Sequence, residues 1–213
     1  MNKKKIGFFG GCFNPVTIAH INLIKETIEK CELDKVYFVP MGDFYLKPEL
    51  IPAKYRYEML KLALEKEAKI DVSKIVIDSN KPTTAIDTFE IINKKFNNSD
   101  NYFIMGSDNF HKISEWKSSE KLKNDYNYII LDRDEIGNKI FYNRKYNEKS
   151  YDRKNEKYQI ISDEAMKNIS SSLVRNKIKQ NEDYNDLVPK EIKDYIEKNN
   201  LYKGEIWEEK LLI

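Results

Sequence analysis

The sequence lacks the features that would at once assign it to a secreted, membrane or metal-binding class. Its two cysteines, Cys12 and Cys31, are too few for a disulfide framework and indicate a reduced, cytoplasmic protein. Its two histidines, His20 and His111, argue against a histidine-rich metal site. No apolar run reaches the roughly 18 residues of a membrane span, and no signal-peptide core follows the basic N-terminus. We therefore expect no membrane partner and no metal site built from protein side chains.

The chain also lacks an excess of charge of either sign. Its 213 residues include 37 Lys and Arg against 35 Asp and Glu, for a net charge of +2. This balance gives no indication of a nucleic-acid or membrane surface, so we expect small-molecule partners and leave a homo-oligomer open. Charged residues make up 34% and hydrophobic residues 40%, which suits one medium-sized globular domain.

Short apolar runs alternate with helical patterns along the chain. The apolar runs predict strands at Ile6–Phe9, Val36–Val39, Ile70–Ile77, Tyr102–Met105, Tyr128–Leu131 and Tyr158–Ile161. Apolar residues at helical spacing predict helices at Ala19–Lys30, Ala53–Lys66, Thr84–Phe96, Ser171–Gln180 and Lys190–Asn199. This alternation is typical of an α/β protein with a Rossmann-like, doubly wound parallel sheet.

The remaining segments complete a single-domain plan. We predict a domain at 1–203, with a small helical part at about 168–203, and a C-terminal tail at 204–213. Asp132–Glu156 is dense in polar residues and has little periodicity, so it is predicted to be a solvated loop. Ligands of a doubly wound sheet bind outside the carboxyl ends of the strands, which directs attention to the turns there.

Glycine is scarce, but three of the seven glycines, Gly7, Gly10 and Gly11, lie within the first eleven residues. Gly10 and Gly11 follow the first predicted strand and precede a helix. A glycine turn lets the backbone approach an anion closely, and a helix N-terminus offers N–H groups to it. The turn matches neither the dinucleotide pattern GxGxxG nor the P-loop. We therefore expect a phosphate site of another type.

Thr17 and His20 lie at the start of the helix that follows this turn. They are three residues apart, so they share one face of the first helical turn and direct polar atoms toward the expected phosphate. A helix cap with a partly buried histidine is the alternative that the pair alone leaves open.

Two later segments have a similar character. Gly106 ends a predicted strand, and Asp108 is suited to accept from a ribose hydroxyl or a nucleobase amine; a left-handed turn with an aspartate cap is the alternative. The serines at 170–172 precede a helix and can hold phosphate oxygens, with Arg175 placed for a bidentate contact. A serine cap beside a surface arginine is the alternative there. Three such elements without a catalytic dyad or triad indicate a nucleoside triphosphate and catalysis by alignment and charge stabilisation.

Taken in order, these motifs resemble those of bacterial nicotinate-nucleotide adenylyltransferases, members of the (H/T)xGH nucleotidyltransferase superfamily. The resemblance covers about 200 residues and is carried by six segments: Gly10–His20, Tyr55–Leu60, Thr84–Thr88, Ile104–Asp108 with Trp116, Asn168–Arg175 and Val188–Tyr202. It implies transfer of AMP from ATP to nicotinate mononucleotide, giving nicotinate adenine dinucleotide and pyrophosphate, with Mg²⁺ on the ATP phosphates.

The resemblance also implies site residues. The catalytic residues would be His20, Thr17 and Arg175. The ATP contacts would come from Gly10, Gly11, Phe13, Thr17, His20, Gly106, Asp108, Ser171, Ser172 and Arg175. The acceptor contacts would come from Thr84, Ala85, Trp116, Lys117, Lys47 and Arg133.

The sequence departs from the family pattern at several motif positions. Thr17 replaces a histidine, Ala19 a glycine, Thr84 a tyrosine and Ala85 a threonine, and Lys117 follows Trp116. Threonine at the first position is usual in pantetheine-phosphate adenylyltransferases. One alternative is therefore the same transfer to nicotinamide mononucleotide or phosphopantetheine, and another is a non-catalytic nucleotide-binding relative. The chain length and the Trp116 region favour a pyridine nucleotide.

Overall fold

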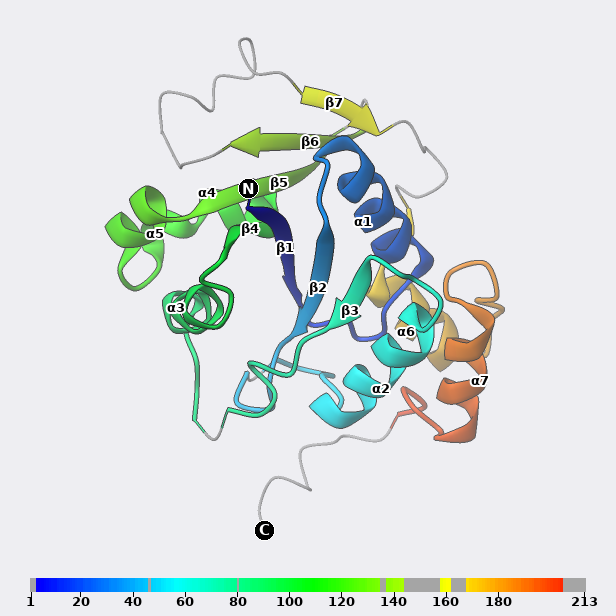
Figure 1. Cartoon of the computed structure of the whole chain (residues 1–213). Coiled ribbons are helices and arrows are strands. Elements are labelled where there is room, and N and C mark those ends of the chain that lie inside the picture. The colour runs from blue at the N-terminus through cyan, green and yellow to red at the C-terminus, as the bar shows by residue number, and fades with distance from the viewer. Residues whose placement is uncertain are drawn as a thin grey trace.

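The computed structural model describes residues 3–45, 47–79, 81–134, 137–143, 158–161 and 168–204. In this part of the chain a seven-stranded sheet has the order β3-β2-β1-β4-β5-β6-β7, and Figure 1 shows helices on both sides of it. The strands are β1 (Lys4–Gly11), β2 (Lys35–Pro40), β3 (Ile70–Val72), β4 (Ser99–Gly106), β5 (Asn127–Asp134), β6 (Gly137–Asn143) and β7 (Tyr158–Ile161). The first five pair in parallel, while β6 and β7 extend the sheet antiparallel.

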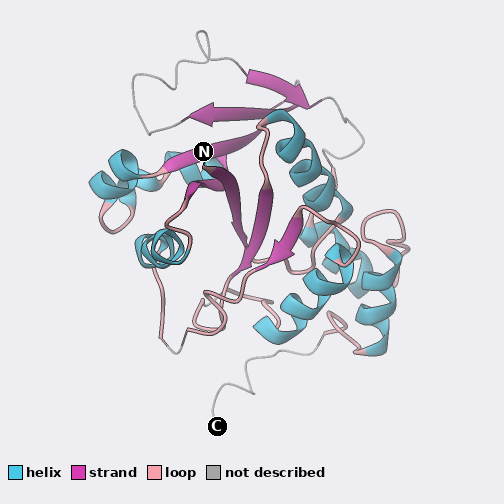
Figure 2. Ribbon diagram, viewed as in Figure 1, coloured by secondary structure: helices cyan, strands magenta, loops and turns pink. Residues whose placement is uncertain are grey.

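The helices form two layers, one on each face of the sheet (Figure 2). One layer holds α1 (Ile18–Lys30), α2 (Ala53–Leu64), α6 (Ser171–Lys179) and α7 (Lys190–Lys198). The other holds α3 (Ala85–Lys95), α4 (Ser107–His111), the 3₁₀ helix η1 (Ile113–Glu115) and α5 (Ser119–Asp125). No helix among the described residues is long and apolar enough to cross a membrane.

Neighbouring residues of one strand contribute to opposite cores. On β1, Phe9 packs under the α1 layer and Phe8 under the α3 layer; Ile104 and Phe103 repeat this arrangement on β4. Successive side chains of a strand point to opposite faces, so a strand covered on both sides needs apolar residues at every position. This is why the central strands read as unbroken apolar runs and were predictable.

The polar segment after β5 differs from its prediction as a loop. β5 continues to Asp134, and β6 returns beside it in antiparallel register, with Leu131 opposite Ile140. The loop prediction is therefore wrong for 132–134 and 137–143, and 144–156 lies outside the described residues. An antiparallel strand near the edge of a sheet tolerates polar residues that a buried parallel strand would not, so composition alone concealed it.

Other predictions hold to within a few residues. The strand at Tyr158–Ile161 and the five helices are present, although the strand predicted over Ile70–Ile77 ends at Val72. After Val72 the chain turns, with Asp78 N–H donating to the Lys74 carbonyl. Apolar residues of a turn that packs against the core produced the longer prediction, since Val76 is buried. The predicted tail beyond Gly204 lies outside the described residues.

The sheet order creates a switch point between β1 and β4. From β1 the chain moves through β2 to β3 at one edge, and then returns to place β4 on the other side of β1. Crossover connections therefore leave in opposite directions at this point and open a crevice at the carboxyl ends of the two strands.

Candidate active site

The two predicted glycine turns meet at the switch point. Phe9 on β1 pairs with Ile104 on β4, so Gly10 and Gly11 at the end of β1 lie next to Gly106 at the end of β4. The glycines are the last residues of their strands and not the turns that the sequence predicted. The structure thus brings together two motifs that are about 95 residues apart, as expected for neighbouring parallel strands. Gly106 has an ordinary φ of −69° and begins α4, so the left-handed turn considered for it is not formed.

Open space surrounds Gly10. A Cβ placed there would have no atom within 4 Å, whereas a Cβ at Gly11 would lie 2.9 Å from the Phe13 ring. Gly10 is also exposed, so its backbone is accessible to a ligand. Phe13 itself is only 3% exposed, and its ring packs on protein, edge-on to the His20 imidazole with centroids 5.5 Å apart. The Phe13 ring is thus buried against protein beside His20, and its contact with a nucleotide stays a prediction.

Thr17 and His20 form a reciprocal cap at the N-terminus of α1. The His20 N–H donates to Thr17 Oγ1 at 3.4 Å, and the Thr17 N–H donates to His20 Nδ1 at 3.1 Å. The Thr17 hydroxyl oxygen also lies 2.6 Å from Nδ1. A backbone N–H can only donate, so Nδ1 accepts and the proton of the neutral ring lies on Nε2. The cap and the predicted chemistry are thus two aspects of one arrangement: Thr17 fixes the ring that presents Nε2–H.

The three serines at the N-terminus of α6 make different contacts. Ser170 is the cap, and its Oγ accepts from the Leu173 N–H at 3.1 Å. Ser171 Oγ donates to the Pro15 carbonyl at 2.7 Å and so joins α6 to the loop before α1. Ser172 is exposed at the first turn of the helix. The N-termini of α1 and α6 are therefore held next to one another, each with N–H groups and a positive dipole end.

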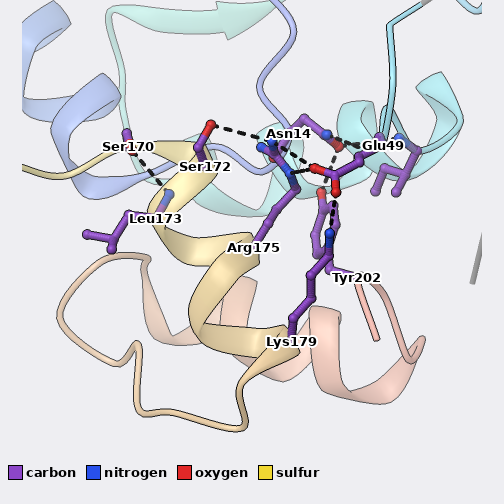
Figure 3. Close-up of polar contacts among 9 residues, drawn as sticks. Asn14, Glu49, Ser170, Ser172, Leu173, Arg175, Lys179 and Tyr202 are labelled. Atoms are coloured by element: carbon purple, nitrogen blue, oxygen red, sulfur yellow. Dashed lines mark hydrogen bonds and ion pairs between the residues drawn. The ribbon is translucent and has the colours of Figure 1, made fainter. Parts of the chain in front are cut away.

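Arg175 is not a solvated surface arginine. Its side chain is 13% exposed, and its Nη1 donates to the Asn14 carbonyl at 3.0 Å (Figure 3). Its Nε and Nη2 each lie 3.3 Å from Oε2 of Glu49, and Nη2 lies 3.4 Å from Ser172 Oγ. The guanidinium is thus fixed between α6 and the loop that follows β1.

The residues expected to bind the acceptor lie on the other layer. Thr84 caps α3, where its hydroxyl donates to Asp87 at 2.7 Å and Ala85 is the first helical residue. The Thr84 hydrogen bonds, together with the charge of Lys117, hold the pKa of the Asp87 carboxyl below its usual value. Lys117 is thus near the start of α3, and half-buried Trp116 packs against the core on this face. Helix N–H groups, an ammonium and an indole together suit an anionic aromatic ligand.

Three of the predicted contacts are placed less fully. Lys47 is exposed on the loop between β2 and α2. Arg133 lies on β5 and Asp108 on α4, but their side chains are outside the described part of the structure. Within that part no group of three or more His, Cys, Asp or Glu side chains could hold a metal ion.

Arg56 lies in Tyr55–Leu60, one of the segments that carry the resemblance, but no role was predicted for it. It is fully buried, and it donates to three carbonyl oxygens: Ile51 at 2.8 Å, Cys12 at 3.0 Å and Met41 at 2.6 Å. These carbonyls belong to the loops after β1 and after β2 and to the entry of α2. Burial lowers the pKa of Arg56, with a nearby Asp43 carboxylate opposing the shift. The sequence signal for a buried Arg56 was its position among the apolar residues of the predicted helix Ala53–Lys66.

Fold and site together define an α/β nucleotidyltransferase. A matching family model, described as cytidylyltransferase-like, covers residues 8–177. One relative, "Probable nicotinate-nucleotide adenylyltransferase" of Carboxydothermus hydrogenoformans, is 35% identical over 93% of this chain and 98% of its own length. A second, of the same name from Staphylococcus haemolyticus, is 31% identical over 96% and 100%. The chain belongs to the cytidylyltransferase-like family and, within it, to the nicotinate-nucleotide adenylyltransferases.

The fold is also that of solved members. A structure of Plasmodium falciparum nicotinic acid mononucleotide adenylyltransferase complexed with NaAD superimposes with a TM-score of 0.73. The superposition covers 95% of this chain and 98% of that one at 24% sequence identity. The Rossmann-like architecture predicted from the sequence is therefore confirmed.

Proposed function

We propose that the protein transfers AMP from ATP to nicotinate mononucleotide and releases pyrophosphate. The observation that carries the chemistry is the Thr17–His20 pair at the N-terminus of α1, in which Nδ1 accepts from the Thr17 N–H and the ring proton therefore lies on Nε2. The choice of acceptor is supported by the names of relatives that are 31–35% identical over almost the whole chain. Two free cysteines fit a reducing, cytoplasmic setting.

The reaction needs alignment rather than a covalent intermediate. A phosphate oxygen of the mononucleotide attacks the α-phosphorus of ATP in line, and pyrophosphate leaves from the opposite side. This oxygen is already anionic at neutral pH, so no general base is required. His20 Nε2–H donates to the α-phosphate, where negative charge grows in the transition state, and Thr17 holds the ring in the tautomer that donates.

The other phosphates lie along the two helix N-termini in this proposal. Gly10 and Gly11 let the chain approach the nucleotide, and Ser171, Ser172 and Arg175 hold the β- and γ-phosphates. Gly106 and Asp108 contact the adenylate ribose. ATP enters as its Mg²⁺ complex, in which phosphate and water oxygens supply the ligands that this hard cation prefers.

The acceptor lies against the α3 layer. The indole of Trp116 stacks on the pyridine ring. The backbone N–H groups at Ala85 and Lys117 bind the nicotinate carboxylate, so the missing side-chain hydroxyl at position 85 does not remove the pocket. Thr84, Lys47 and Arg133 border the mononucleotide.

Pyrophosphate release tests the proposal directly. Purified protein with ATP and Mg²⁺ receives one acceptor at a time: nicotinate mononucleotide, nicotinamide mononucleotide or phosphopantetheine. We expect kcat/KM for nicotinate mononucleotide to exceed that for the others by about tenfold or more. Turnover only with another acceptor would replace the substrate, and no turnover with any acceptor would favour a non-catalytic nucleotide-binding protein.

A further inference from the structure

The carboxylate of Glu49 is paired with the guanidinium of Arg175, which is proposed to bind the triphosphate. Glu49, on the loop between β2 and α2, pairs with Arg175 through Oε2 and with Lys179 through Oε1 (Figure 3). Both cations come from α6, on successive turns of the same face. The Glu49 carboxylate thus lies where an anionic ligand of Arg175 is proposed to bind.

The pairing with Arg175 is loose. Both contacts reach the same carboxylate oxygen at 3.3 Å, longer than the roughly 2.7–2.9 Å of a strong charge-assisted hydrogen bond. The Glu49 side chain is 46% exposed, so water competes for it. An ion pair of this kind is weak and open to exchange for a ligand of higher charge.

The backbone nonetheless holds Glu49 in this place. Its φ is 62°, in the left-handed region that a residue other than glycine adopts only when its surroundings impose it. Asn14 Nδ2 donates to the Glu49 carbonyl at 2.8 Å, and the same Asn14 presents its own carbonyl to Arg175. The carboxylate and the guanidinium are thus held in register by one residue of the loop before α1.

Glu49 is ionised at neutral pH. The hydrogen bond from Lys179, with a contribution from Arg175, holds the pKa of the Glu49 carboxyl below its usual value. Phosphate and carboxylate are both anions, and the Nε–Nη2 edge of one guanidinium cannot pair fully with both. When Arg175 turns to phosphate, Lys179 keeps Glu49 paired, so the exchange breaks one ion pair rather than two.

We propose that Glu49 is a built-in counter-ion that competes with the triphosphate for Arg175, weakening the binding of ATP and pyrophosphate and promoting pyrophosphate release. The inference rests on the proposed function, because it takes Arg175 as the phosphate ligand. It makes Glu49 a residue that sets phosphate affinity without touching the reacting atoms.

Glu49→Gln tests the inference, because it keeps the shape of the side chain and removes the charge. We expect the dissociation constants of ATP and of pyrophosphate, measured by calorimetry on the full chain, to fall about two- to fivefold. Glu182→Gln is the matched control. Glu182 lies after α6 and pairs at 3.2 Å with Lys177, a residue of α6 like Arg175. Glu182→Gln therefore removes a negative charge that does not pair with Arg175, and we expect both dissociation constants to stay unchanged.

The direction of the change separates competition from a structural role. If Glu49 only held Arg175 in place, Glu49→Gln would lower the affinity for both ATP and pyrophosphate. A lower or unchanged affinity therefore overturns the inference. In an Arg175→Gln background the effect of Glu49→Gln should disappear. If the wild-type protein turns over nicotinate mononucleotide but Glu49→Gln does not bind ATP and pyrophosphate more tightly, the proposed function is retained and the counter-ion role is rejected. If Glu49→Gln binds both ligands more tightly but the wild-type protein turns over no acceptor, the counter-ion role is retained and the proposed function is rejected.

Discussion

The hydroxyl of Tyr202 donates a hydrogen bond to Oδ1 of Asn14 at 3.0 Å, across 188 residues of sequence. Both residues are buried, and burial raises the pKa of Tyr202 far above its usual value, so the hydroxyl keeps its proton. The same Oδ1 accepts from the Ile51 N–H at 3.4 Å. The segment after α7 therefore fastens the loop between β1 and α1, whose backbone is proposed to bind phosphate.

Tyr202→Phe removes this hydrogen bond and leaves the ring in place. We expect the free energy of unfolding to fall by about 1–2 kcal/mol, because a buried acceptor loses a partner. The KM for ATP should rise as well, since the loop before α1 loosens. Urea unfolding and initial rates measure both effects. Tyr195→Phe, at a half-buried tyrosine on α7, is the control, and equal effects of the two variants would contradict the assignment.

His20→Ala removes the side chain that we propose as the donor to the α-phosphate. We expect kcat to fall by about 100-fold or more while the dissociation constant of ATP changes little, because the donor acts on charge that develops only in the transition state. Rapid-quench or steady-state assays measure the first, and calorimetry measures the second. His111→Ala, at the other histidine of the chain, serves as the control. A His20→Ala enzyme with nearly normal turnover would remove His20 from the mechanism.

Gly10→Ala separates binding from folding. A Cβ at Gly10 has no atom within 4 Å, so the melting temperature should stay within a degree or two of wild type. The methyl group would lie in the open space of the turn, where we expect ATP affinity to fall about tenfold. Gly11→Ala is the contrast, because its Cβ would lie 2.9 Å from the Phe13 ring and lower stability too. Unchanged ATP binding in Gly10→Ala would mean that the nucleotide does not approach this turn.

Arg56→Met should destabilise the protein by about 3 kcal/mol or more. Three carbonyls from two loops would lose their donor while remaining wholly or partly buried. Denaturant unfolding monitored by circular dichroism measures the loss. Lys61→Met on the same helix removes an exposed contact to Asp71 and should cost less than about 1 kcal/mol. Similar losses in both variants would show that Arg56 does not tie the loops together.

Burial of the Cys31 thiol should make the free energy of unfolding depend on pH in the alkaline range. Burial raises the pKa of the Cys31 thiol to about 11 from its ordinary 9.0. Between these values the unfolded chain loses the proton and the folded chain keeps it, so the free energy of unfolding falls as pH rises. The contribution is fully present below pH 9 and is lost by about pH 11. Cys31→Ala should show a smaller decline than wild type, and Cys12→Ala should not; equal declines in all three would contradict the assignment.

The site elements that the sequence predicted are those made by neighbours in the chain. The strand β1 with its terminal glycines and the capped helix α1 depend on contacts within a few residues, as does the Ser170 cap of α6. The alternation of elements likewise predicted the parallel sheet, and the order of strands placed Gly106 beside Gly11. Such signals survive in the sequence because hydrogen bonding and side-chain periodicity act at short range.

What the sequence by itself determined is therefore the type of fold, the glycine motifs at the ends of two strands and the identity of the capping histidine. Only the tertiary structure decided which side chains meet from distant segments. Arg56 donates to carbonyls on two loops, Glu49 pairs with Arg175 across 126 residues, and Tyr202 donates to Asn14. Polar β6 extends the sheet because it pairs in antiparallel register with β5 on one side and β7 on the other. These contacts depend on the path of the whole chain in space, and no local pattern of residues encodes that path.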